Sequence, residues 1–99
     1  MELTSKQRRI LRALAHHLKP VVQVGTGGLT EAVLAKAEAE IDYHELIKVK
    51  VSKDSPTPTS DASVQLSTAL RAGVAQIIGR TVILYRPRKK RPSIRLPAE

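Results

Sequence analysis

The sequence predicts an α/β domain of two layers, in which helices and strands follow the order αβαβαββ. Two observations predict this fold class. Three stretches carry apolar residues at the spacing of an amphipathic helix, and four shorter stretches are rich in β-branched residues or alternate between apolar and polar residues. Breaks that contain Gly or Pro separate these stretches. A chain of 99 residues has room for one such domain.

The first helix is expected over residues 5–17. Thr4 is a candidate N-cap, and Gln7 completes a capping box three residues later. Pro20 ends the helix, because the residue before a proline is pushed out of the helical region. The apolar residues that share one face of this helix are Ile10, Leu11, Leu14 and Leu18. A short strand follows, with the β-branched residues Val21, Val22 and Val24.

Residues 25–28, with the sequence Gly-Thr-Gly-Gly, break this strand and lead into a second helix. Thr30 or the loop before it opens the helix, whose apolar positions are Leu29, Val33, Leu34, Ala37 and Ile41. Residues 46–51 then alternate between apolar and basic side chains, with Lys48 and Lys50 on one side and Ile47, Val49 and Val51 on the other. This alternation predicts a strand with one buried face.

Residues 52–60 form a loop that contains two prolines. Asp61 or a neighbouring hydroxyl group is expected to cap a third helix, which ends near Gly73. Its apolar positions are Val64, Leu66, Ala69 and Leu70. Residues 74–78 and 81–85 form a hairpin, because Gly79 in the first position of a two-residue turn suits type II′. We expect residues 1–86 to form the domain and residues 87–99 to form a basic tail.

Charge is the first functional clue. Seventeen Lys and Arg against nine Asp and Glu leave a net charge of +8. The excess is uneven: residues 1–30 carry +4, residues 31–42 carry −3, and residues 86–99 carry +5. Such asymmetry favours a polyanionic ligand along one surface. The chain has no Phe or Trp and only two Tyr, so contacts to phosphates and shape should dominate over base stacking.

No motif supports catalysis, and we expect no enzyme, no cofactor and no metal site. The glycine loop lacks the lysine of a P-loop and the third glycine of a dinucleotide fingerprint. His16 and His17 are adjacent and point to different sides of their helix, and the serines lack a nucleophile-elbow context. The chain has no cysteine, no apolar leader and no run of about 20 apolar residues. We therefore expect a cytoplasmic protein that does not bind membranes.

Four blocks in order resemble the CRM domain (chloroplast RNA splicing and ribosome maturation). They are residues 15–18, residues 19–30 (Lys-Pro-Val-Val-Gln-Val-Gly-Thr-Gly-Gly-Leu-Thr), residues 44–50 (His-Glu-Leu-Ile-Lys-Val-Lys) and residues 78–87. The chain is similar to the stand-alone bacterial form, the YhbY family, over about residues 2–95. The resemblance implies a mixed four-stranded sheet packed with helices, similar to the C-terminal domain of translation initiation factor three.

The resemblance also implies a function. Stand-alone members associate with precursors of the large ribosomal subunit, and plant relatives act in intron splicing. Their GxxG loop, like that of KH domains, meets the RNA backbone; it corresponds to Gly25, Thr26, Gly27 and Gly28. Relatives often carry a basic or amide side chain at the two middle positions, so backbone amides and nearby cations would make the contact here.

We therefore expect one RNA-binding surface. Its residues are the glycine loop (Gly25, Thr26, Gly27 and Gly28), Lys6, Arg9 and Arg12 of helix one, Lys19, and Arg86 and Arg88 at the base of the tail. Lys48 and Lys50 rank lower, because helices two and three could cover them. The expected partner is ribosomal RNA bound by a monomer, with no small-molecule substrate. A DNA-binding or nucleoid protein and a basic protein-interaction adaptor remain as alternatives.

Overall fold

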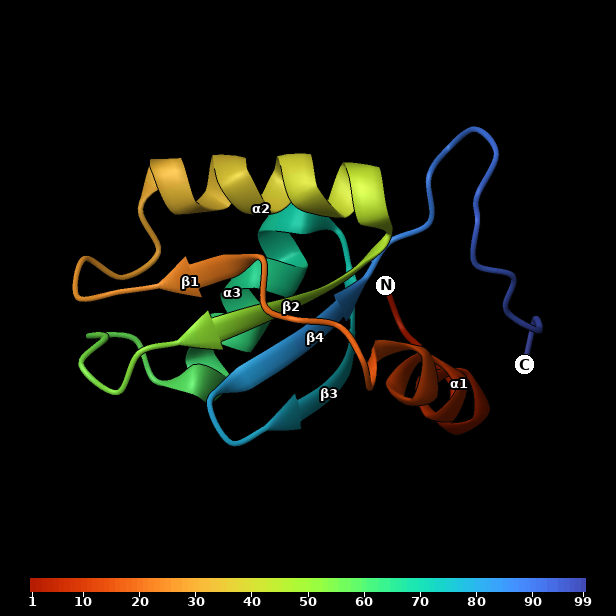
Figure 1. Ribbon diagram of the computed structural model, residues 1–99, viewed down its shortest axis with the longest axis horizontal. Coiled ribbons are helices and arrows are strands. Elements are labelled where there is room, and N and C mark those ends of the chain that lie inside the picture. The colour runs from red at the N-terminus through yellow and green to blue at the C-terminus, as the bar shows by residue number, and fades with distance from the viewer.

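Three helices and four strands follow one another in the predicted order in the computed structural model, which describes residues 1–99 (Figure 1). They are α1 (Ser5–Ala15), β1 (Val22–Val24), α2 (Glu31–His44), β2 (Leu46–Val51), α3 (Thr59–Leu70), β3 (Gly73–Ile78) and β4 (Thr81–Tyr85). None of the helices is long and apolar enough to cross a membrane.

The four strands form one mixed sheet in the order β1-β2-β4-β3. β1 runs parallel to β2, whereas β4 is antiparallel to both of its neighbours. The hairpin turn has Gly79 at φ +55°, as the first position of a type II′ turn requires. The structure therefore confirms the expected fold class, including the mixed four-stranded sheet.

The two faces of the sheet are covered unequally. α2 and α3 pack on one face and enclose a core cluster of 13 buried residues, including Ile41, Val49 and Leu66. α1 packs on the other face at one end only, where Leu11 and Ala15 meet Leu46, Ala75, Ile83 and Tyr85. The rest of that second face carries no helix.

Local signals at the helix starts behave as predicted for two helices. Thr4 and Gln7 form the full capping box of α1, and the Thr30 hydroxyl accepts the Val33 N–H at the start of α2. The prediction for α3 is wrong, since it begins at Thr59 after Pro58 and has no side-chain cap. α3 ends at Leu70, and its C-cap is Arg71 with φ +53° rather than a glycine.

Two predicted apolar faces differ from the observed ones. In α1, Leu14 is 50% exposed, because this helix contacts the sheet along a narrow line through Leu11 and Ala15. In α3, Val64 is 63% exposed, and the buried residues are Ala62, Ser63, Leu66 and Leu70. α1 also ends at Ala15, two residues before its predicted end.

Gly73 belongs to β3 and not to a helix end. A Cβ atom at this position would lie 2.8 Å from the side chain of Leu3, so glycine lets the N-terminal segment pack closely on β3. A register shift between Val74 and Gln76 follows directly, which is the signature of a β-bulge.

Candidate nucleic-acid interface

The uncovered part of the sheet is a polar and basic face. Cross-strand pairs place Lys50 between Gln23 and Thr81, and Lys48 opposite Ile83. Because paired residues point to the same side of a sheet, these side chains share one face with Gln76 and Ile78 of β3. Ile83 itself is buried under α1, so we call the remaining residues the open face: Gln23, Lys48, Lys50, Gln76, Ile78 and Thr81.

Lys48 and Lys50 are therefore not under α2 and α3, and the reason for ranking them lower was wrong. The two helices pack on the opposite face, against Ile47, Val49 and Val51. Lys50 is exposed and Lys48 is half-buried. Strand alternation alone separates the lysines from the core, but only the packing of α1 reveals that their side stays accessible.

A hollow at each end of the open face adds further cations. Where α1 meets the sheet, Arg12, His16 and His17 line one hollow together with Lys48. At the opposite end, Lys53 and Arg80 line a second hollow together with Lys50 and Gln23. We call the cations of the open face and its two hollows the basic strip: Arg12, Lys48, Lys50, Lys53 and Arg80.

Sequence reasoning did not single out Lys53 and Arg80. Each lies in a turn, where a single charged residue in the sequence looks like ordinary solvent-exposed surface. The antiparallel pairing of Lys50 with Thr81 brings the end of β2 beside the start of β4, and so brings these two turns together. The strand pairing was the missing information.

The glycine loop has one structural glycine. Gly28 is buried at φ +74°, and a Cβ there would lie 3.1 Å from Cγ of Pro56. Its N–H donates to the carbonyl of Gly25 over 3.0 Å, which closes a tight turn. By contrast, Gly25 and Gly27 have no positive φ, and an added Cβ would meet nothing closer than 3.5 Å. The fold thus requires glycine at position 28 but not at positions 25 and 27. At those two positions, the absence of a side chain would let a ligand come close to the main chain.

The glycine loop and α1 are not neighbours, although sequence reasoning placed them in one surface. They lie at opposite ends of the long axis of the molecule (Figure 1). The physical reason is the extended segment from Lys19 to Gly25, which can span about 20 Å at 3.3 Å per residue. Lys6 and Arg9 are exposed on α1, and Lys19 precedes β1. The basic strip is what connects the two ends.

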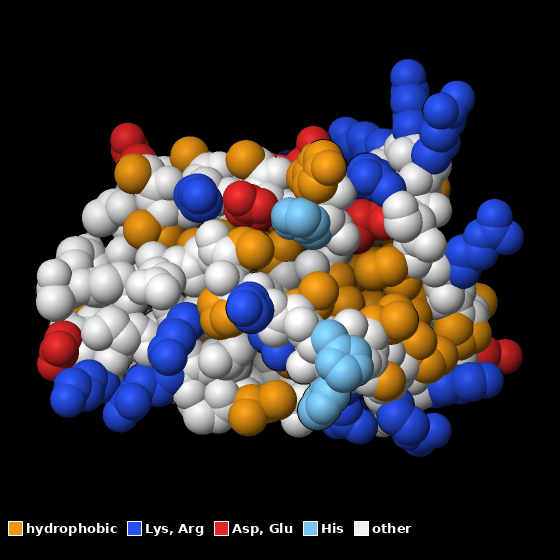
Figure 2. All heavy atoms as spheres, viewed as in Figure 1, with side chains coloured by type: hydrophobic (Ala, Val, Ile, Leu, Met, Phe, Trp, Pro, Cys, Tyr) orange, Lys and Arg blue, Asp and Glu red, His pale blue; other side chains and the backbone are white.

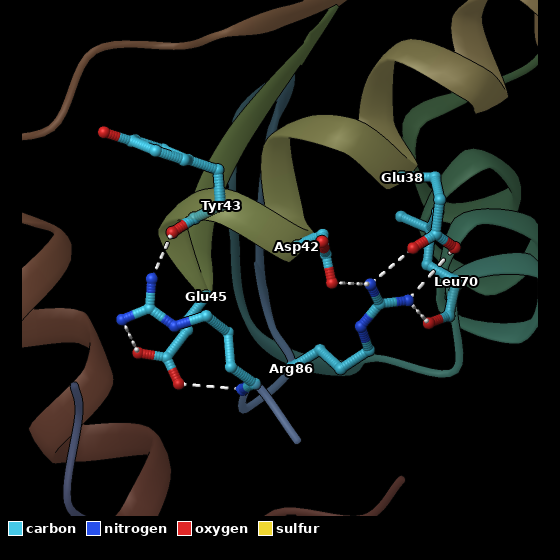
Figure 3. Close-up of polar contacts among 7 residues, drawn as sticks. Glu38, Asp42, Tyr43, Glu45, Leu70 and Arg86 are labelled. Atoms are coloured by element: carbon cyan, nitrogen blue, oxygen red, sulfur yellow. Dashed lines mark hydrogen bonds and ion pairs between the residues drawn. The ribbon is translucent and has the colours of Figure 1, made fainter. Parts of the chain in front are cut away.

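Arg86 has internal partners (Figure 3). Its guanidinium forms two hydrogen bonds to the Glu38 carboxylate, donates to the Leu70 carbonyl over 2.9 Å and lies 3.6 Å from Asp42. Hydrogen bonds from Arg86 hold the pKa of Glu38 below its usual value, despite partial burial. This geometry ties β4 to α2 and leaves little of the Arg86 charge for a ligand.

Arg88 is also held by the protein. One of its terminal nitrogens donates to the Tyr43 carbonyl over 3.0 Å, and the other hydrogen-bonds the Ser93 hydroxyl and lies 3.7 Å from the Glu45 carboxylate. Its Nε is buried without a partner. The structure therefore gives Arg86 and Arg88 structural contacts on the α2 side, away from the open face.

Figure 2 shows the resulting distribution of charge. Lys and Arg side chains gather at the lower left and at the lower right of the view, and a further group lies over the C-terminal segment at the upper right. The acidic side chains of α2 lie along the upper part of the view, where Figure 1 shows that helix. Neither tyrosine adds a ring to the open face, since Tyr85 is buried in the core under α1 and Tyr43 belongs to α2.

Comparison with known proteins adds the family. Residues 3–86 match the model of the CRS1 / YhbY (CRM) domain. The chain is 38% identical over 95 residues to the "Probable RNA-binding protein YqeI" of Bacillus subtilis, covering 96% of this chain and 99% of that protein. It is 42% identical over 95 residues to a Haemophilus influenzae protein named "RNA-binding protein", covering 96% of this chain and 95% of that protein.

A solved structure has the same fold. The solution structure of the hypothetical protein SAV1595 from Staphylococcus aureus superposes with a TM-score of 0.79 at 37% identity, covering 96% of this chain and 99% of that one. Sequence similarity and the arrangement of helices and strands are thus shared over nearly the whole length of the two chains. The chain belongs to the CRS1 / YhbY (CRM) domain family.

Proposed function

We propose that this protein binds RNA, and that the basic strip and the glycine loop hold its sugar–phosphate backbone. The observation that carries the proposal is the position of Lys48 and Lys50 on the sheet face that α1 covers at one end only. A hollow at each end of the open part of this face adds more cations. The names of the two bacterial relatives as RNA-binding proteins support RNA as the polyanion.

The chemistry of this surface favours backbone contacts. Lysine and arginine side chains neutralise phosphates and fix the position of the ligand. Gln23, Gln76 and Thr81 add neutral hydrogen-bonding groups to the open face, and these can reach 2′-hydroxyls or base edges. Gly25 and Gly27 let a phosphate approach the main chain. No Phe, Tyr or Trp side chain of this surface is available for stacking.

We propose binding without catalysis. The histidines beside the strip, His16 and His17, contact each other edge to face and share no hydrogen bond with a serine or threonine. The hydroxyl groups of Ser63 and Ser67 donate to carbonyls of their own helix. This arrangement contains no activated nucleophile.

A charge reversal on the open face tests the proposal. Lys50→Glu should weaken binding to a labelled RNA stem–loop at least several-fold and make its salt dependence shallower by about 0.7–0.9 for each phosphate that the variant no longer neutralises. The matched control is Lys36→Glu, which makes the same change of charge on the outer side of α2 and should have a much smaller effect. Equal losses in the two variants would show that net charge alone, and not the open face, controls binding.

The finer proposal is that the RNA is ribosomal and that the protein, as a cytoplasmic monomer, assists assembly of the large subunit. It rests on the resemblance to stand-alone family members. In a sucrose gradient of a cell lysate, the protein should move with precursors of the large subunit, and ribonuclease should release it. Migration only with the small subunit or with free protein would contradict this. Release by deoxyribonuclease would favour a DNA-binding role, and resistance to both nucleases a protein adaptor.

A further inference from the structure

We propose that Glu45 holds residues 88–94 as a preformed basic loop, and that the tip of this loop, Lys89, Lys90 and Arg91, is a second RNA phosphate-binding site. This inference rests on the proposed RNA-binding function and extends it to a part of the chain that the open face does not include. We call residues 88–94 the clasped loop.

Glu45 is an unusual residue for its position. It caps the C-terminal end of α2 with φ +67°, which is left-handed backbone that few residues other than glycine adopt. Its side chain is completely buried. Burying a carboxylate is unfavourable unless hydrogen bonds replace its water. The fold must therefore supply partners.

The clasped loop supplies those partners from its two ends. At the first end, the Arg88 N–H donates to Oε2 of Glu45 over 2.9 Å. At the second end, the N–H groups of Ser93 and Ile94 donate to Oε1 over 2.6 and 3.3 Å. Burial alone would raise the pKa of Glu45, but these hydrogen bonds and the charge of Arg88 outweigh it and leave the pKa lowered.

The tip of the clasped loop points three cations into solvent. Lys89, Lys90 and Arg91 are exposed, and none of them forms an ion pair within the protein. Arg91 turns the chain at φ +55°. Adjacent like charges repel and favour an extended chain, so an unclasped segment would not keep this turn.

A purely structural role does not account for the clasped loop. Ile94 and Leu96 pack against the core under α1, and the Pro97 carbonyl accepts a hydrogen bond from Gln7 over 2.6 Å. That part of the segment covers apolar surface. Residues 89–93, in contrast, are exposed, and none of them belongs to either core cluster. The buried carboxylate therefore orders an exposed cationic turn. Such preorganisation reduces the conformational entropy that the loop would lose on binding a polyanion.

Three variants of the full chain test this inference. Glu45→Gln keeps the size of the side chain but replaces an acceptor by an amide donor that faces N–H groups. A second variant, Lys89→Ser with Lys90→Ser and Arg91→Ser, removes the tip charges and keeps the clasp. The control is Glu40→Gln, which makes the same change of charge as Glu45→Gln but within α2, where Glu40 pairs only with Lys36 and His44.

The measured quantities are affinity for an RNA stem–loop of about 16 base pairs, the length that double-stranded RNA-binding domains cover, and the rate of trypsin cleavage in the loop. By charge alone, both glutamine variants should bind RNA at least as tightly as the parent. The clasp predicts the opposite for Glu45→Gln, which should bind several-fold more weakly, approach the tip variant and be cut by trypsin several-fold faster.

Binding by Glu45→Gln that equals that of Glu40→Gln would overturn the inference, as would an unchanged cleavage rate. If Glu45→Gln fails to fold, the tip variant alone decides, because its changes are on the surface: parental affinity would reject the site. Lys50→Glu separates the two proposals. If it loses binding while the tip variant does not, only the clasped loop is rejected. If the parent binds no RNA, the proposed function fails as well.

Discussion

At the scale of single residues, the glycine loop separates folding from function. Gly28 has a backbone conformation and a close neighbour, Pro56, that only glycine tolerates well. Gly27 has neither restraint. The sequence Gly-Thr-Gly-Gly gives no sign of this difference, because it depends on the backbone angles of the folded loop and on a neighbour from the β2–α3 connection.

The two positions should therefore respond differently to substitution. Gly28→Ala should lower the free energy of unfolding by about 1 kcal/mol, because its φ is positive. Gly27→Asp should melt close to the parent and yet bind RNA several-fold more weakly, because its carboxylate would repel a phosphate. Gly27→Asn is the matched control for size, and it should bind more tightly than Gly27→Asp. Parental RNA affinity of Gly27→Asp would mean that the loop is only a turn.

Glu45 gives the protein a dependence on acid pH whose sign follows from its lowered pKa. A carboxylate whose pKa is lowered by folding stabilises the protein at pH values above its pKa in the unfolded chain, 4.5. That contribution is lost as the pH falls through the pKa of the folded protein. The difference in unfolding free energy between the parent and Glu45→Gln should thus be largest near neutral pH and shrink below pH 4.5. Chemical denaturation at a series of pH values measures it, and a constant difference would contradict the assignment of the charged form.

At the scale of elements, the order and approximate bounds of helices and strands follow from the sequence alone. Capping residues, prolines and alternation are local signals, and they locate α1, α2, β2 and the hairpin well. Predictions of which side of a helix is buried fail where the element that packs against the helix determines the buried side. Leu14 in α1 and Val64 in α3 fit an amphipathic pattern, yet each helix meets its neighbours along another line. Likewise, Lys53 and Arg80 join the basic strip only through strand pairing.

The C-terminal segment is the element that differs most from expectation. Its charge and prolines predict a basic tail outside the domain, but Ile94 and Leu96 pack under α1, and Glu45 binds the main chain of residues 88, 93 and 94. These contacts join positions more than 40 residues apart, between Glu45 and the segment. No local pattern reports such a contact.

Removal of residues 87–99 should therefore have two effects. It deletes five bases and one acid, so RNA affinity should fall and its salt dependence should become shallower. It also exposes the core under α1 and leaves Glu45 without donors, so the free energy of unfolding should fall by about 1–3 kcal/mol. Adding Glu45→Gln to the truncated chain should restore part of this loss. A truncated chain that melts like the parent would show that the segment is not bound in solution.

At the scale of the whole molecule, charge is sorted by surface. The basic strip lies on the face opposite α2 and α3, the acidic side chains gather on α2, and the clasped loop lies beside the C-terminal end of α2. The glycine loop is at one end of a molecule 37 Å long, and α1 and the clasped loop are at the other. An RNA that contacts all of these parts must cover that length.

The most direct measurement is an NMR titration of the labelled protein with an RNA stem–loop at moderate salt. We expect amide shifts to change along the open face and its neighbouring loops, at residues 23–27, 48–53 and 80–81, and in the clasped loop, while α3 and the outer side of α2 stay unchanged. Shift changes concentrated on α2 and α3, with residues 48–53 unaffected, would show that RNA does not bind the open face of the sheet.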